Sequence, residues 1–223
     1  MQEISNKSFR VSEIFYSIQG EGSRAGLPCI FVRFQGCRLR CSWCDTPYAL
    51  EFDNDGDLMS GEDIVSKVRQ YKCNFIEFTG GEPLEQAGII ELMDYYIKNN
   101  YIVAIETAGY ISVKDIPKEV IKIIDVKTPG SKMHKKNNLE NLAYLTKQDE
   151  IKFVVDSKED YEWAKKFILD NDLSSKVENI LLSPVFGRLE YIDLAEWILH
   201  DNLPVRMQIQ LHKYIWSPNK RGV

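Results

Sequence analysis

The 223-residue sequence lacks the features of a secreted, membrane or nucleic-acid-binding protein. No uninterrupted apolar run approaches the ~18 residues of a membrane span, and the first ten residues, MQEISNKSFR, contain no apolar leader region. Excess positive charge is missing too, because 28 Lys and Arg stand against 33 Asp and Glu, a net charge of −5. We therefore expect a cytoplasmic protein with neither a membrane nor a nucleic acid as a partner.

A disulfide framework is also absent. The cysteines number five, an odd count, and Cys37, Cys41 and Cys44 fall within eight positions. In a reducing compartment such a cluster indicates metal binding or redox chemistry. A chain of this length buries roughly 70% of its unfolded surface and folds without a metal, so a metal held here would serve function. Cys29 and Cys73 lie beside predicted strands and are interpreted as small buried hydrophobes.

Repeats, low-complexity tracts and polar linkers are absent, so residues 1–223 are interpreted as one domain. Short β-branched and aromatic runs predict strands whose separation is too long for hairpins. These strands are Ile30–Phe34, Phe75–Thr79, Ile102–Glu106, Ile121–Val126, Ile151–Val155, Ile180–Ser183 and Val205–Leu211.

Helix signals lie between most of the predicted strands. Ser60-x-x-Asp63 and Ser157-x-x-Asp160 predict helix caps, and Pro83 predicts a third helix start. Alternating strands and helices predict an α/β fold with right-handed βαβ units and a parallel sheet. About six units fit, fewer than the eight of a complete barrel. We expect an incomplete, TIM-like β/α barrel or an open parallel sheet, with its site at the carboxyl ends of the strands.

The three clustered cysteines follow the first strong strand. Three thiolates suit an iron-sulfur cluster or zinc, but a structural zinc or an electron-carrying 4Fe-4S cluster takes four protein ligands. Three ligands leave one metal position open, where a catalyst can bind another molecule. Arg38 and Arg40 lie between the cysteines and are expected to lower the pKa of the thiols.

Two motifs resemble the radical S-adenosylmethionine (AdoMet) superfamily. One is the Cys-x3-Cys-x2-Cys spacing with Trp43 before its last cysteine, and the other is Gly80-Gly81-Glu82-Pro83 at the end of the next predicted strand. The resemblance implies that the cysteines hold a 4Fe-4S cluster whose open iron binds AdoMet. Electron transfer to AdoMet then yields a 5′-deoxyadenosyl radical, and the Gly-Gly-Glu-Pro element binds the methionine amine.

Further segments resemble the 7-carboxy-7-deazaguanine synthase family, most strongly over residues 13–129. They are FYSIQGEG at 15–22, FVRFQGC at 31–37 and the Asp45-Thr46 pair. The resemblance implies a lyase that converts 6-carboxy-5,6,7,8-tetrahydropterin to 7-carboxy-7-deazaguanine and ammonia, in queuosine and 7-deazapurine biosynthesis. The radical would abstract hydrogen from C6 of the substrate, with Mg²⁺ assisting. A homodimer and an external electron donor of flavodoxin or ferredoxin type are also implied.

Site residues follow from this resemblance. Thr46 is the implied Mg²⁺ ligand, Arg33 pairs with the substrate carboxylate, and Glu21 accepts from its guanidine-like N–H groups, roles that suit these side chains. The implied substrate-binding residues are Ile18, Gln19, Gly20, Glu21, Arg33, Thr79, Gln210 and His212. The implied AdoMet-binding residues are Trp43, Cys44, Asp45, Gly81, Glu82, Lys127, Thr128, Ser183, Pro184, Val185 and Phe186.

The last part of the chain departs from the family pattern. Segment 178–223 is expected to close the substrate site, but Ser183-Pro184 stands where family members often have Gln-Pro. In some members the chain terminus itself enters the site. The tail after Ser217 is longer than expected, so Val223 is given no role.

Two alternatives stay open. A glycyl-radical-enzyme activating protein shares the fold and cysteine spacing, but Gln19-Gly20-Glu21-Gly22, Arg33 and Asp45-Thr46 favour a small carboxylated heterocycle. From another class, the chain could be a non-catalytic iron-sulfur or zinc binding module. Its fourth ligand would be Cys73, His134 or His212, none of which lies at a zinc-finger spacing.

Overall fold

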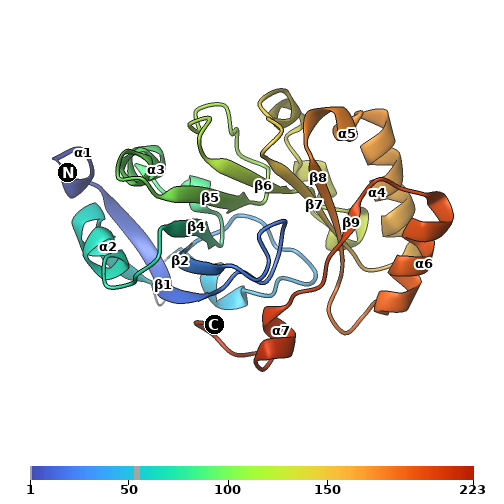
Figure 1. Ribbon diagram of the computed structural model, residues 1–223, viewed down its shortest axis with the longest axis horizontal. Helices are drawn as coiled ribbons and strands as arrows, with labels where there is room; N and C mark the ends of the chain where they lie inside the picture. Colours follow the sequence, from blue (N-terminus) through green and yellow to red (C-terminus); the bar gives the residue numbers. More distant parts are fainter. Residues whose placement is uncertain (1, 53–55) are drawn as a thin grey trace.

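A curved nine-stranded sheet forms the centre of the molecule (Figure 1). The computed structural model describes residues 2–52 and 56–223. The strand order is β3-β1-β2-β4-β5-β6-β7-β8-β9, parallel from β2 to β9, while β1 pairs antiparallel with β2 and β3. The strands are β1 (Ser8–Ile18), β2 (Pro28–Phe34), β3 (Asp57–Ser60), β4 (Phe75–Gly80), β5 (Ile102–Thr107), β6 (Ile121–Asp125), β7 (Glu150–Val155), β8 (Asn179–Pro184) and β9 (Arg206–Met207). The expected α/β class with a mostly parallel, incomplete barrel is confirmed.

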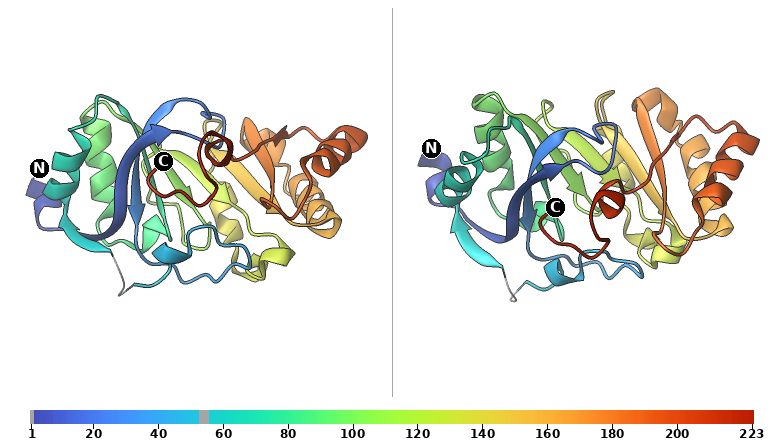
Figure 2. Two further views of the ribbon diagram at one scale, coloured as in Figure 1. Left: turned by 90° about the horizontal axis from the view of Figure 1, so that it is seen from below. Right: turned by 60° about the horizontal axis from the view of Figure 1, so that its bottom comes forward.

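The larger helices lie along the outer side of this sheet (Figures 1 and 2). Helix α3 packs on β5, α4 on β7 and α6 on β9. The helices are α1 (Gln2–Ser5), α2 (Gly61–Val68), α3 (Ile89–Lys98), α4 (Lys158–Asp170), α5 (Leu173–Lys176), α6 (Tyr191–Asp201) and α7 (His212–Ile215). Within the described part of the chain, no helix combines the length and the apolar character needed to cross a membrane.

Local sequence signals explain where two of these helices begin. The Ser60 hydroxyl accepts from the Asp63 N–H at 3.1 Å, and the Asp63 carboxylate accepts from the Ser60 N–H at 2.9 Å, a complete capping box at α2. At α4 the Ser157 hydroxyl accepts from the Asp160 N–H at 3.3 Å. Both predicted caps are confirmed.

The predicted helix start at Pro83 is wrong. Pro83 begins only a three-residue 3₁₀ turn, Pro83–Glu85, and α3 begins at Ile89. Between them Gln86 is extended and Gly88 has a φ of +93°, a left-handed conformation that interrupts a helix. The Gln86 side chain donates to the Gln35 carbonyl at 2.8 Å and accepts from a β1 N–H at 3.0 Å, which holds this break in place.

The strand predictions need two corrections. Only Arg206–Met207 of the seventh expected segment forms a strand; the Gln208 N–H still donates to the Leu182 carbonyl of β8 at 2.9 Å, and the chain then turns so that Gln210 lines the cavity. A hairpin also exists, because β1 pairs antiparallel with β2 across the loop 19–27. In β1 the alternation of buried and exposed residues is interrupted by a register shift between Val11 and Glu13. This interruption weakens the strand pattern in the sequence.

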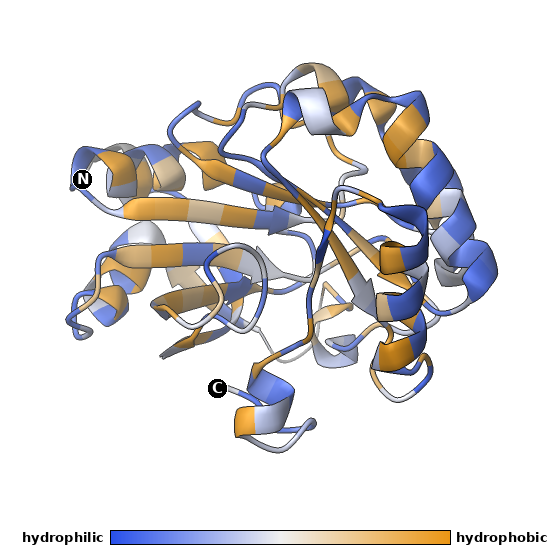
Figure 3. Cartoon of the chain, turned by 45° about the vertical axis from the view of Figure 1, so that its right-hand side comes forward, coloured by the Kyte–Doolittle hydropathy of each residue, from blue (hydrophilic) through white to orange (hydrophobic). Residues whose placement is uncertain are grey.

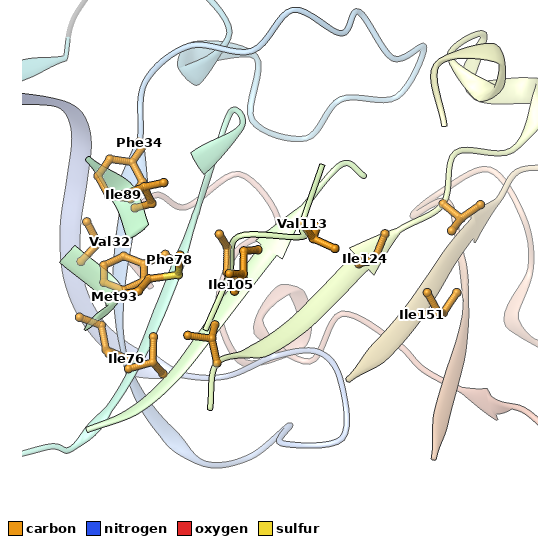
Figure 4. Packing of buried hydrophobic residues seen from close by; sticks show 14 of the residues in the cluster. Val32, Phe34, Ile76, Phe78, Ile89, Met93, Ile105, Val113, Ile124 and Ile151 are labelled. Carbon is orange, nitrogen blue, oxygen red and sulfur yellow. The ribbon is translucent and has the colours of Figure 1, made fainter. Parts of the chain in front are cut away.

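The parallel strands are buried on both faces. On the outer face, side chains such as Val32, Ile76 and Phe78 pack against α3, as Figure 4 shows for the side of the core around Ile89 and Met93. Figure 3, coloured by hydropathy, shows strands that are mostly hydrophobic and helices that carry both hydrophobic and hydrophilic residues. On the inner face a second apolar cluster, Phe15, Cys29, Phe31, Phe75, Ala104, Ile121 and Ile123, lies near the amino ends of the strands. The inner face toward the carboxyl ends is free to carry polar groups.

Candidate active site

A cavity of about 990 Å³ lies on the inner side of the sheet. Successive strands contribute inward side chains because residues alternate between faces, as with Glu77 and Thr79 of β4. The loop with the three cysteines, the loop after β1 and residues 218–223 complete its wall. The volume lies at the upper end of the range for small-molecule sites and suits a cofactor together with a substrate.

The loop with the three cysteines is fastened at both sides. The Gly36 N–H donates to the Ala49 carbonyl at 2.8 Å, and the Cys37 N–H donates to the Leu50 carbonyl at 2.9 Å. On the other side, the Ser42 N–H donates to the Ser131 carbonyl at 3.2 Å. The loop is therefore set by backbone contacts to both flanking segments, and its three thiols line the cavity.

The thiols of Cys37 and Cys41 lie in an environment that favours their neutral form. Burial raises the pKa of Cys37 to about 11 and also raises that of Cys41. The expectation that Arg38 and Arg40 lower these pKa values is wrong, because both arginines form ion pairs with Glu side chains instead. The cation that favours the thiolates of Cys37 and Cys41 is Lys127.

Lys127 is positioned from its backbone and its side chain. The Asn137 amide pairs with the Lys127 N–H and C=O, each at 2.9 Å, and the Lys127 ammonium lies 2.7 Å from Asp125. Burial by itself would lower the pKa of Lys127, but Asp125 and Cys41 raise it above its usual value. The residue is thus a fixed positive charge beside the cysteine loop.

Gly80 and Gly81 serve close backbone packing. A Cβ at Gly81 would lie 2.4 Å from the Gly36 carbonyl oxygen and 2.5 Å from that of Ala49. Gly80 has a φ of +141°, and a Cβ there would meet the backbone of Phe34. The glycines let the end of β4 touch the segment that carries Cys37, and both also line the cavity.

Two of the predicted AdoMet-binding residues, Glu82 and Thr128, direct their side chains to partners within the protein and not into the cavity. The Glu82 carboxylate is fully buried and accepts from the Thr107 hydroxyl and the Ala108 N–H, each at 2.8 Å, and from the Leu84 N–H at 3.1 Å. Burial raises the pKa of Glu82 to about 7 despite these donors. The Thr128 hydroxyl donates to the Val154 carbonyl at 2.9 Å. Neither residue lines the cavity, in contrast to the other predicted residues.

Glu21 lies on the loop after β1 and also lines the cavity. Its two oxygens accept from Lys152 at 2.7 Å, Gln210 at 2.9 Å and Gln208 at 3.0 Å. Burial would raise the pKa of Glu21, but the charge of Lys152, the hydrogen bonds from Lys152 and Gln210, and His212 lower it to about 2. Glu21 is therefore an ionised acceptor across the neutral pH range.

Arg33 belongs to a connected polar group in the cavity wall. Its Nε–H donates to Glu13 at 2.8 Å, and the Tyr48 hydroxyl donates to the same Glu13 oxygen at 2.9 Å. The guanidinium of Arg221, from the tail, lies 3.7 Å from the centre of the Tyr48 ring. In the sheet register Arg33 lies level with Thr79, so the two predicted substrate residues share one height of the wall.

The last residues of the chain line the cavity. From β9 the tail runs back toward β1 and β2, as Figures 1 and 2 show. The Leu211 N–H donates to the Gly20 carbonyl at 3.0 Å, and His212 is packed so closely that a Cβ on Gly20 would lie 2.2 Å from its Nδ1. Burial lowers the pKa of His212, which is therefore neutral at pH 7. Val223, to which the sequence assigned no role, lines the cavity.

Several cavity residues escaped the sequence argument. They are Glu13, Tyr48, Glu77, Glu106, Asp125, Lys152 and Arg221. Glu77, Glu106 and Lys152 interrupt otherwise apolar strands, and a charge at an inward strand position is the signal that could have found them. Tyr48 and Arg221 lie outside the long strands, so no periodicity marks them.

The zinc-module alternative finds little support. Cys73 precedes β4, whereas the cysteine loop follows the far end of the neighbouring β2, and the Cys73 thiol contacts the Pro28 carbonyl at 3.4 Å. Across residues 2–52 and 56–223, no three His, Cys, Asp or Glu side chains converge as ligands of one metal ion. A 4Fe-4S cluster is bound by cysteine thiolates, and three free thiols on one cavity wall match that donor set.

Comparison with known proteins decides the family. A profile of the Radical SAM superfamily matches residues 31–145. The 7-carboxy-7-deazaguanine synthase of Chlorobaculum tepidum is 45% identical over 216 residues, covering 96% of both chains. That of Koribacter versatilis is 39% identical and covers 96% of this chain and all of its own. This chain belongs to the 7-carboxy-7-deazaguanine synthase family.

The solved structures agree with this 7-carboxy-7-deazaguanine synthase assignment. The crystal structure of QueE from Escherichia coli superposes with a TM-score of 0.72 at 26% identity, covering 92% of this chain and 95% of that one. Membership of the Radical SAM superfamily implies a 4Fe-4S cluster and AdoMet as cofactors. Cys37, Cys41 and Cys44 are the residues that fit the cluster.

Proposed function

We propose that this protein is a radical AdoMet lyase that converts 6-carboxy-5,6,7,8-tetrahydropterin to 7-carboxy-7-deazaguanine and ammonia, in queuosine and 7-deazapurine biosynthesis. One observation carries the proposal: a single cavity is lined by the three clustered cysteines and by Glu21 and Arg33. The radical source and the recognition groups for a carboxylated, guanidine-like heterocycle thus share one chamber.

The chain's own residues bind and orient the substrate. When bound, the cluster and AdoMet supply the 5′-deoxyadenosyl radical that abstracts the hydrogen at C6. Glu21, ionised and fixed by three donors, accepts from the N–H groups of the pterin edge. Arg33 is oriented by Glu13 through Nε and pairs with the substrate carboxylate. Residues 218–223, which line the cavity, would exclude water from the bound substrate.

AdoMet is proposed to bind between the cysteine loop and the end of β8. Trp43, Asp45 and Gly81 line this part, together with the segment from Ser183 to Phe186. Lys127 adds a positive charge that offsets the thiolates. Glu82 and Thr128 support the wall from behind, because their side chains are bonded within the protein.

Thr46 is proposed as the protein ligand of Mg²⁺. It lines the cavity two residues after Cys44, and its hydroxyl makes no capping bond to the 3₁₀ turn that follows, Pro47–Ala49. One hydroxyl oxygen together with substrate and water oxygens suits this ion.

An external electron donor of flavodoxin or ferredoxin type is proposed to dock on the outer side of the cysteine loop. Arg38 and Arg40 are exposed there, and exposed Lys132, Lys135 and Lys136 lie on the adjoining segment, which contacts the loop through Ser131. These cations oppose the net charge of −5 and favour an acidic partner. Charge reversal of Lys135 and Lys136 to Glu should slow turnover driven by the protein donor and leave dithionite-driven turnover unchanged.

A homodimer is proposed from the family resemblance. Ile192 and Leu199, seven residues apart on α6, are 66% and 74% exposed and supply apolar surface for association. Sedimentation equilibrium tests this proposal, and a monomer at all concentrations would contradict it.

The reaction itself is tested with anaerobically purified, iron- and sulfide-reconstituted protein. Dithionite, AdoMet, Mg²⁺ and 6-carboxytetrahydropterin should yield 7-carboxy-7-deazaguanine without stoichiometric loss of AdoMet, followed by absorbance and product mass. Slow AdoMet cleavage with untouched pterin would favour a glycyl-radical activator. The tail inside the cavity argues against that alternative, because it occupies space that a partner's glycine loop would need.

A further inference from the structure

Lys152 is a buried lysine of the cavity to which the proposed reaction assigns no part. It is the third residue of β7, and its side chain is 7% exposed. Its ammonium lies 2.7 Å from a Glu21 oxygen and 2.5 Å from a Glu106 oxygen on β5. One buried cation thus joins the loop that follows β1 to the opposite wall of the barrel.

The cavity around Lys152 is rich in carboxylates. The other cavity cations that neighbour this region have partners of their own, since Lys127 pairs with Asp125 and Arg33 with Glu13. Burial and the nearby carboxylates raise the pKa of Glu77 well above its usual value, which favours its neutral form. Lys152 is therefore the ammonium group that pairs with both Glu21 and Glu106.

We propose that Lys152 is a positioning residue, whose buried ammonium group holds the Glu21 carboxylate in place as an ionised acceptor for the N–H groups of the pterin. The inference rests on the proposed function and assigns to Lys152 the control of substrate affinity. Lys152 acts through Glu21 and takes no part in bond breaking.

Lys152 differs from the other two donors to Glu21. A carboxylate has about four acceptor positions, of which the three donors occupy three, so a pterin with two N–H groups has to displace one of them. Gln210 can yield, because its Nε2 also lies 3.2 Å from an Asp45 oxygen that accepts from it. Lys152 balances the charge of Glu21, and no amide can replace that contribution.

The loop itself does not depend on Lys152. Glu150 accepts from the Ser23 N–H at 3.1 Å and from Arg24 at 3.2 Å, and Gln208 accepts from the Gly22 N–H at 2.7 Å. These bonds anchor residues 22–24 from β7 and from the segment after β9. Removing the Lys152 ammonium should therefore disturb the Glu21 side chain and leave the loop backbone in place.

Loss of the ammonium changes the protonation of Glu21. The charged or titratable groups that face Glu21 and Lys152 are Glu77 on β4, Glu106 on β5, Asp125 at the end of β6, Lys127 just after it, Glu150 on β7 and His212 on α7. Lys127 is paired with Asp125, and most of the other groups are carboxyl groups, so burial and like charge would raise the Glu21 pKa without Lys152. Protonated Glu21 loses acceptor capacity, and recognition would then weaken as the pH falls.

The test compares Lys152→Met with wild type in binding 6-carboxypterin, an analogue that keeps the carboxylate and the guanidine-like edge but has no hydrogen at C6. Calorimetry is run with the reconstituted enzyme and AdoMet at about pH 6 and about pH 7.5, where the pterin ring keeps its N–H groups. Wild type should bind equally at both values. Lys152→Met should bind about 10- to 100-fold more weakly at the lower pH and recover at the higher one.

Lys122→Met is the matched control. Lys122 is also a buried lysine, 2.9 Å from Asp149, but it lies at the start of β6 away from the cavity. The Lys122→Met substitution should lower the stability of the protein and leave its affinity for the pterin independent of pH. If Lys152→Met fails to fold, Lys152→Met/Glu106→Gln also removes the stranded neighbouring charge and should keep the loss of affinity at low pH.

The outcomes separate the two proposals. A wild type that neither binds nor converts the pterin would overturn the proposed function and this inference with it. A wild type that binds and converts the pterin, beside a Lys152 variant with unchanged affinity or an equal loss at both pH values, would overturn the inference alone.

Discussion

Gly81→Ala tests how the cysteine loop is held against the end of β4. The new Cβ would lie 2.4 Å and 2.5 Å from the carbonyl oxygens of Gly36 and Ala49, below the 3.0 Å that real Cβ contacts respect. Both obstacles are backbone atoms, and Gly36 also accepts from the Glu82 N–H at 2.8 Å, so neither can rotate away. We expect a loss of about 1–3 kcal/mol of stability, typical of overpacking. The strain should fall on the residue next to Cys37.

The assay for Gly81→Ala combines thermal unfolding with iron content and AdoMet cleavage. The melting temperature should fall by about 2–4 °C for each kcal/mol lost. Iron per chain and the cleavage rate should fall as well, because Cys37 is displaced. Gly61→Ala is the control: its Cβ would meet the Ile4 carbonyl at 2.6 Å, far from the cavity, and should cost stability without loss of iron. Normal iron loading and cleavage in Gly81→Ala would refute the reasoning.

Three further predictions concern single side chains. Burial raises the Glu82 pKa from 4.5 to about 7. Between these two pH values the native state binds more protons than the unfolded state, so the free energy of unfolding falls as the pH rises from 4.5 to about 7. Glu82→Gln should remove this part of the slope in urea unfolding of the apoprotein, and an unchanged slope would count against it. Thr46→Ala should raise the Mg²⁺ concentration needed for half-maximal activity, whereas Thr46→Ser should not; equal requirements would exclude Thr46 as the ligand. Asn141→Ala should lower the free energy of unfolding in denaturant by roughly 2–4 kcal/mol. The buried Asn141 amide accepts a hydrogen bond from the Val113 N–H and donates to the carbonyls of Gly109 and Ile111. A loss below about 1 kcal/mol would show that water replaces the amide.

The fold was largely predictable because its signals are local. Ser60 and Ser157 cap the helices that the sequence predicts, and the parallel strands are mostly apolar because both of their faces are covered. The helix start at Pro83 was not predictable, because the left-handed Gly88 and the contacts of Gln86 to distant strands end the turn. The hairpin of β1 and β2 was missed because a register shift breaks its alternation.

The candidate site was predictable where a motif carries it. The cysteine spacing, Glu21 and Arg33 are local patterns, and all of these residues line one cavity. Glu82 shows the limit of this reasoning, since its motif position predicts a cofactor contact while its side chain bonds to Thr107 and Ala108. The roles of the lining residues stay predictions until ligand binding is measured.

By itself, the sequence determined the chemistry that the chain can perform, because three thiols at fixed spacing and two adjacent glycines act through local geometry. Only the tertiary structure decided which charges meet. Lys152 and Glu21 are 131 residues apart in sequence, and Arg221 reaches Tyr48 from the opposite end of the chain. The curvature of the sheet and the return of the tail bring these groups together, and no periodicity along a chain encodes a contact between its distant parts.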